Sequence, residues 1–138
     1  MRKLLHRLGH ICGPLFVFLI TVFSLTNASS TPSLSSYLKH ADKMFHFGAY
    51  AILGCLLMWS IGISEASLKM KSYLPRMAIA WLIALLIGGA IEIVQPYFGR
   101  GLEVLDFICD ALGAACGAAF GVISLRWADR FDQKRSRE

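Results

Sequence analysis

The sequence carries little charge and lacks the usual motifs of a soluble enzyme. Only 17% of its 138 residues are charged, whereas soluble domains average about 25%. No CxxC pair, no dense metal-ligand motif and no serine or cysteine paired with a base is visible. Hydrophobic residues make up 56% of the chain, which is too many for a disordered protein. These features exclude an ordinary soluble domain and favour an integral membrane protein with little mass outside the bilayer.

Four apolar stretches approach the length of a membrane span. A helix needs about 20 mostly apolar residues to cross about 30 Å of hydrocarbon. The four stretches are residues 11–26, 45–63, 77–94 and 107–125. None shows the alternation typical of a barrel strand. We therefore predict an all-α fold, in which residues 1–138 form one membrane domain built as a compact four-helix bundle.

The positions of lysine and arginine predict the orientation of these spans. Eleven of the 14 precede the first span, separate the second from the third, or follow the fourth. Because positive loops stay inside, both termini are expected in the cytoplasm, with the chain crossing the membrane several times. No basic folded domain is present to bind nucleic acid. An alternative for the first span is a signal peptide that is cleaved after Ala28.

Small residues predict how the helices pack. Gly113, Gly117 and Gly121 are four residues apart, so they line one face of the fourth span. Close backbone contact supplies much of the attraction between helices in lipid. We expect this face to pack within the chain, with homodimer formation as the alternative, and the oligomeric state stays open. The four cysteines fall within the predicted spans and are expected to be small buried residues.

The polar residues of the last three spans gather at one membrane face. Assigned to this region are Asp42, Lys43, His46, Tyr50, Glu92, Gln95, Arg100, Asp106 and Asp110. Residues four apart share a helix face. A charge within a span costs at least about 2.5–3.5 kcal/mol, so such residues usually pair or face a cavity. We predict that all except Asp42, which we assign as a structural helix cap, line an outward-facing pocket that binds a ligand.

The ligand chemistry follows from the cations in this region. Lys43, Arg100 and a protonated His46 would attract an anion, and helix N-termini directed at the pocket would add to that attraction. A phosphate or a carboxylate group fits this description. Two alternatives stay open: an ion-pair network that only holds the bundle, and a route for protons or ions.

An enzymatic role is a further alternative. Glu92 or Asp110 would act as general base, with His46 as its acid/base partner. The substrate would be a lipid or a lipid-linked phosphate. A mixed site of His46, Glu92 and Asp106 is one way to hold a divalent metal, but without a dense ligand motif we assign no metal and no cofactor.

The order of the polar motifs resembles the VanZ-like family of small bacterial membrane proteins. The motifs are Asp42-Lys43-x-x-His46-Phe47-x-x-Tyr50, Glu92-x-x-Gln95 before Gly99-Arg100, and Asp106-x-x-x-Asp110-x-x-Gly113. The resemblance spans residues 40–122. It implies a location in the bacterial inner membrane, a role in the cell envelope and a link to resistance to the glycopeptide teicoplanin, without supplying a reaction. The ligand of the pocket would then be a lipid headgroup, a peptidoglycan precursor or a glycopeptide. The family pattern commonly has asparagine where Asp110 stands.

Overall fold

The computed structural model describes residues 1–26, 35–62, 70–99 and 103–137. Four long helices account for nearly all of them. They are α1 (Arg2–Thr26), α2 (Ser35–Ile61), α3 (Met70–Val94) and α4 (Val104–Arg135). A short 3-10 helix, η1 (Gln95–Phe98), continues α3. The described part of the chain contains no strand, so the predicted all-α fold is confirmed.

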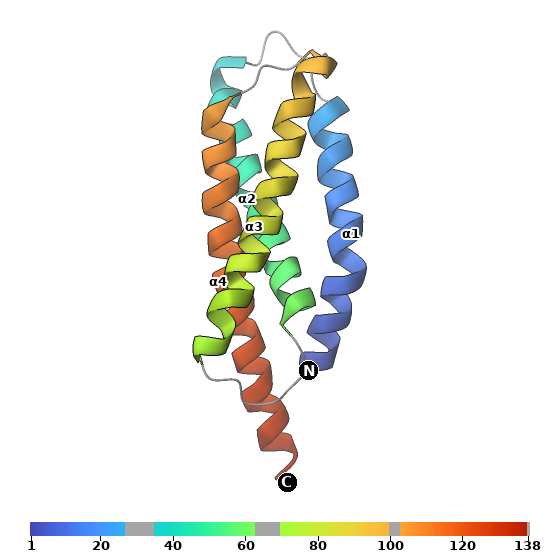
Figure 1. Cartoon of the computed structure of the whole chain (residues 1–138), viewed down its shortest axis with the longest axis vertical. Coiled ribbons are helices and arrows are strands. Elements are labelled where there is room, and N and C mark those ends of the chain that lie inside the picture. The colour runs from blue at the N-terminus through green and yellow to red at the C-terminus, as the bar shows by residue number, and fades with distance from the viewer. Residues whose placement is uncertain (27–34, 63–69, 100–102, 138) are drawn as a thin grey trace.

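The helices run up and down in turn, so both termini lie at the same end of the bundle (Figure 1). We call this the termini end and the opposite one the far end. Helices α1 and α3 finish at the far end, and α2 and α4 begin there. Each of the four is long and apolar enough to cross a membrane. Many of the large apolar side chains, such as Phe18, Leu86 and Phe120, are exposed, as expected for a surface that faces lipid.

The helices extend beyond the apolar stretches that predicted them. Helix α4 runs ten residues past residue 125, and α2 begins at Ser35 rather than at residue 45. Polar residues continue a helix once the apolar part has formed it, because propagation needs only one further hydrogen bond per residue. The assignment of Asp42 as a helix cap is therefore wrong. Asp42 lies two turns inside α2, so it is not at the helix N-terminus.

Glycines bring α2 and α4 into backbone contact along a seam. A Cβ atom on Gly117 would overlap the carbonyl oxygen of Ala51, and one on Gly113 would overlap that of Phe47. Gly54 approaches Ala114 in the same way from the α2 side. The predicted packing within the chain thus accounts for this face of α4. Because any side chain would separate the helices, the seam fixes where α2 and α4 meet at the far end.

The two remaining helices pack against this pair. Gly9 of α1 lies against the backbone of Leu56 and Ser60 of α2. Trp81 of α3 donates a hydrogen bond of 2.9 Å from its ring N–H to the backbone oxygen of Ala111 in α4. These contacts hold α1 against α2 and α3 against α4. Polar residues of α2, α3 and α4 then face one another at the far end.

Candidate functional site

A cluster of charged side chains lies between α2, α3 and α4 at the far end. We define the far-end cluster as Lys43, His46, Glu92, Asp106 and Asp110. A spacing of three residues places Lys43 and His46 near one face of α2, and a spacing of four places the two aspartates on one face of α4. All members except Lys43 are buried. The prediction that these residues converge from separate helices agrees with this geometry.

Lys43 connects the mouth of the cluster to its interior. Its ammonium group donates to Glu103 at 3.0 Å and to Asp106 at 3.1 Å. Glu103 is 55% exposed, whereas Asp106 is only 5% exposed. Lys43 therefore neutralises a buried aspartate from the more open side of the cluster.

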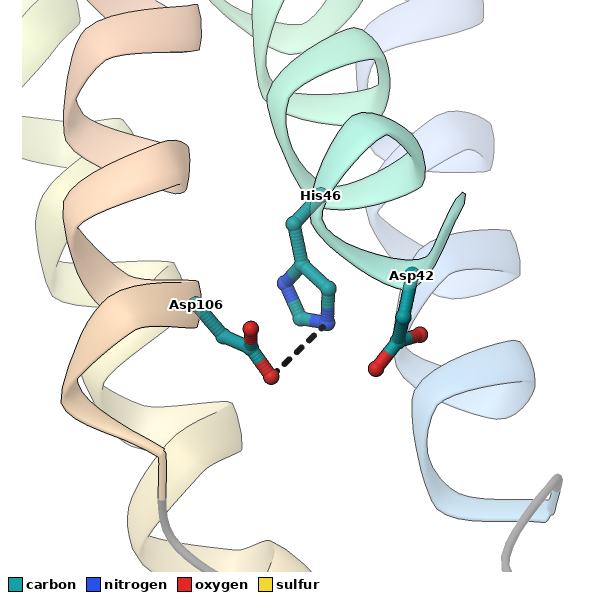
Figure 2. A group of neighbouring side chains, drawn as sticks. All are labelled: Asp42, His46 and Asp106. Carbon is teal, nitrogen blue, oxygen red and sulfur yellow. Dashed lines mark ion pairs between the residues drawn. The ribbon is translucent and has the colours of Figure 1, made fainter. Parts of the chain in front are cut away.

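His46 stands between the two aspartates of α4. Its Nδ1 lies 2.9 Å from Oδ1 of Asp110, at hydrogen-bond distance. Its Nε2 lies 3.8 Å from Oδ2 of Asp106, the pair marked in Figure 2. The figure also shows Asp42 on the other side of the ring, one turn earlier in α2. The imidazole thus faces carboxylates through both of its nitrogens.

Glu92 is a buried carboxylate that no hydrogen bond satisfies. It is only 5% exposed, and neither oxygen has a hydrogen-bond partner among the described residues. The backbone N–H of Glu103 lies towards it without forming a hydrogen bond of ordinary geometry. The side-chain nitrogen of Gln95, one turn further on, is likewise buried and without a partner. Buried polar groups in native proteins almost always have partners, so Glu92 and Gln95 are exceptions to that rule among the described residues.

Tyr50 closes the cluster on the side nearest the bundle centre. A Cβ atom on Gly88 would lie 3.1 Å from both the Tyr50 hydroxyl and Oδ2 of Asp110. The absence of a side chain at Gly88 therefore lets Tyr50 and Asp110 reach the same point against α3.

One predicted site residue lies outside the described part of the chain, and one residue of the site was not predicted. Arg100 lies outside the described residues, so its predicted place in the pocket stays a prediction. Glu103, which was not predicted, proves to be a partner of Lys43. Its position three residues before Asp106, one helical turn away, was the available signal.

An apolar groove runs along α2 and α4 away from the polar residues. Its volume is about 490 Å³, and it is lined by Ala51, Ile52, Cys55, Leu56, Trp59, Cys116, Gly117 and Phe120. Cys116 is exposed and the other three cysteines are partly exposed, so the prediction that all four are buried is wrong. The groove carries no charged side chain and is separate from the far-end cluster.

A second group of charges occupies the termini end. In this termini cluster, Asp129 of α4 binds the guanidinium of Arg2 and accepts a 3.2 Å hydrogen bond from the Tyr73 hydroxyl. The backbone N–H of Arg2 also donates to Asp132 at 3.1 Å. The side chains of Arg2 and Asp129 are 6% and 11% exposed. Sequence reasoning had used Arg2 only as a marker of orientation.

Comparison with known families agrees with this arrangement. The VanZ/LLP1 family model matches residues 9–125. The chain belongs to the VanZ/LLP1 family. The match covers α1, α2, α3 and the part of α4 that contains the glycine seam and the far-end cluster. No curated protein and no solved structure shows a significant match. For this VanZ/LLP1 protein, the function therefore has to be argued from its own residues.

Proposed function

We propose that this VanZ/LLP1 protein binds an anionic ligand of the bacterial cell envelope at the far-end cluster. The observation that carries the proposal is the partly exposed cation Lys43 at the mouth of a buried polar cluster, in which Glu92 has no hydrogen bond among the described residues. A cluster built only to hold the bundle would pair its charges, because an unpaired buried charge is strongly destabilising. An unsatisfied group that is retained in a polar interior is instead typical of a binding site.

The site lies where a lipid headgroup would be. With both termini in the cytoplasm, as the distribution of lysine and arginine predicts, the far end faces out. Lys43 is the partly exposed cation of the cluster, and Arg100 follows η1 in the sequence. A phosphate-bearing headgroup, a peptidoglycan precursor or a glycopeptide would meet these cations first. Binding of a glycopeptide at this site would account for the link to teicoplanin resistance that the family resemblance implies.

The carboxylates of the cluster oppose an anion and limit how it binds. Among the described residues, Lys43 is paired with Asp106, whereas Glu92 and Asp110 have no permanent cation in contact. An anionic ligand therefore binds only together with a positive charge that compensates these two carboxylates.

The test is thermal stabilisation of the detergent-purified protein by defined ligands. The ligands would be an anionic phospholipid, a polyprenyl phosphate and teicoplanin, with a neutral detergent as reference. We expect one of the three to raise the melting temperature of the wild type. The rise should be smaller in Lys43→Ala and Arg100→Ala. If no ligand shifts the wild-type melting temperature, the proposal fails.

A second candidate function is hydrolysis of a lipid-linked phosphate. The observation that favours it is the hydrogen bond between His46 and Asp110, since a carboxylate that orients a histidine is a common arrangement for a general base. Phosphate release from a polyprenyl pyrophosphate by the purified protein, lost in His46→Gln, would support it. Binding of that lipid without turnover would leave the binding function alone.

A further inference from the structure

We propose that His46, Glu92 and Asp110 hold one divalent transition-metal ion, with Zn²⁺ as the best fit. The sequence led us to assign no metal, because no segment carries a dense ligand motif. In the folded chain the ligands come one each from α2, α3 and α4, so no local motif is needed. The inference goes beyond ligand binding, because it assigns an ion and its coordinating atoms.

The three side chains already stand at nearly the required separation. One ligand atom from each can be chosen so that all lie within 4.8 Å of one another, and all three residues are buried. Zn²⁺ binds nitrogen and carboxylate oxygen at about 2.0–2.2 Å. Ligand atoms around one ion therefore lie about 3–3.5 Å apart, and small side-chain rotations close the difference. Three protein ligands leave the fourth position open, as in catalytic zinc sites.

The buried carboxylate of Glu92 is an independent sign of a cation site. Both of its oxygens are buried, and neither has a hydrogen-bond partner among the described residues. Burying an ionised carboxylate is costly unless it is paired or coordinates a metal. Proximity alone would make His46, Glu92 and Asp110 an ordinary polar cluster, but a buried carboxylate that is unpaired within the described part of the chain supports a cation at this place.

A divalent ion also balances the charge of the far-end cluster. Lys43 compensates Asp106, and this leaves the negative charges of Glu92 and Asp110. A charge of +2 with a neutral His46 makes the cluster neutral. A monovalent ion would leave one buried charge uncompensated.

The surroundings of His46 suit a metal ligand. If Nδ1 binds the ion, the ring proton lies on Nε2, which faces Oδ2 of Asp106 at 3.8 Å. Histidine ligands usually donate their other N–H to a carboxylate, which fixes the orientation of the ring. Asp106 is in turn held by Lys43 at 3.1 Å. Asp106 therefore lies close enough to accept the His46 N–H after a small shift of the side chains.

A competing set of ligands uses the other face of the ring. Asp42, His46 and Asp106 also bring one ligand atom each to within 4.8 Å (Figure 2). We favour the deeper set because Asp106 is already bonded to Lys43 and Asp42 has an interaction of its own. Both carboxylates therefore already have an interaction, whereas Glu92 has no hydrogen bond among the described residues.

The experiment measures Zn²⁺ binding to chelator-treated protein in detergent, by calorimetry and by elemental analysis of the metal content per chain. We expect one Zn²⁺ per wild-type chain. Affinity should fall about tenfold or more in Glu92→Gln and in Asp110→Asn. Asp42→Asn and Glu103→Gln remove nearby carboxylates and should bind Zn²⁺ as the wild type does. Melting of each variant without metal controls for folding.

Three results would overturn the assignment. One is the absence of stoichiometric Zn²⁺ in the wild type. Another is loss of the ion in Asp42→Asn with retention in Glu92→Gln, which would place it on the other face of His46. The third is strong destabilisation of the metal-free protein by Arg100→Ala, which would identify Arg100 as the missing partner of Glu92.

The metal site and the proposed function can fail separately. A phosphate oxygen of the envelope ligand would occupy the open coordination position of the Zn²⁺. This part of the inference rests on the proposed function. If Zn²⁺ binds but no envelope ligand shifts the melting temperature, the metal assignment stands and ligand binding fails. If a ligand stabilises chelator-treated protein as strongly as the Zn²⁺-loaded form, ligand binding stands and the metal assignment fails.

Discussion

The two ends of the bundle differ in how one buried carboxylate is paired. At the termini end, Asp129 is bonded to both Arg2 and Tyr73. At the far end, Glu92 is as deeply buried but has no hydrogen bond among the described residues. Both clusters draw on α3 and α4, so their helices do not explain the difference. The contrast agrees with a structural role for the termini cluster and with the binding role that we propose for the far-end cluster.

The largest change is expected from the seam on which both clusters depend. Gly117→Leu places a bulky side chain where even a Cβ atom would overlap the backbone of Ala51. Separation of α2 and α4 should abolish the folded protein, measured as loss of the monodisperse species in detergent. Gly48→Leu is the matched control on α2, because no atom lies within 4 Å of a Cβ there. Equal yields of the two variants would refute the seam.

The next largest effect should come from the termini cluster. Asp129→Asn leaves the buried guanidinium of Arg2 without its counter-charge. Breaking a buried ion pair costs about 3 kcal/mol, so the melting temperature should fall clearly. Asp132→Asn is the control, because that side chain is 46% exposed and exposed pairs contribute less than about 1 kcal/mol.

A double variant sharpens this result. Arg2→Met together with Asp129→Leu removes both charges and should recover much of the stability. If Asp129→Asn has the melting temperature of the wild type, the termini cluster does not stabilise the protein. The two ends would then not differ in the role of their buried carboxylates.

The smallest effect should come from the exposed rim of the far-end cluster. Glu103→Gln removes one of the two carboxylates bonded to Lys43, and Glu103 is 55% exposed. Solvent weakens such a pair, so the change in unfolding free energy should stay below about 1 kcal/mol. Lys43 retains its bond to Asp106. A fall in unfolding free energy as large as that of Asp129→Asn would contradict this expectation, because it would show that the pair of Lys43 and Glu103 stabilises the far end.

Patterns local in sequence predicted much of this architecture. Apolar length gave four helices, and the spacing of Gly113 and Gly117 gave a packing face that the structure places against α2. Because a helix has a fixed period, four-residue spacing put Asp106 and Asp110 on one face of α4, ready to meet His46 of α2. These features need only neighbouring residues to be recognised.

Features that depend on tertiary contacts were missed. The pairing of Arg2 with Asp129 joins the first turn of α1 to the last turns of α4, and no local pattern links residues so far apart. The cap assignment of Asp42 failed because an apolar run does not define where a helix begins. The sequence also showed cations and carboxylates at one face without showing that Lys43 and Asp106 neutralise each other. That pairing leaves an excess of negative charge at the far end and changes the expected chemistry of the site.

The most direct test of the central claim is the melting temperature of Glu92→Gln in metal-free detergent solution, with Asp129→Asn measured in parallel. If Glu92 is an uncompensated buried charge kept for binding, its neutralisation should leave the protein as stable as the wild type or raise its stability by about 1 kcal/mol. Asp129→Asn should melt well below both. A fall in Glu92→Gln that matches the fall in Asp129→Asn would show that Glu92 has a structural partner, and the account of the far-end cluster as a binding site would be contradicted.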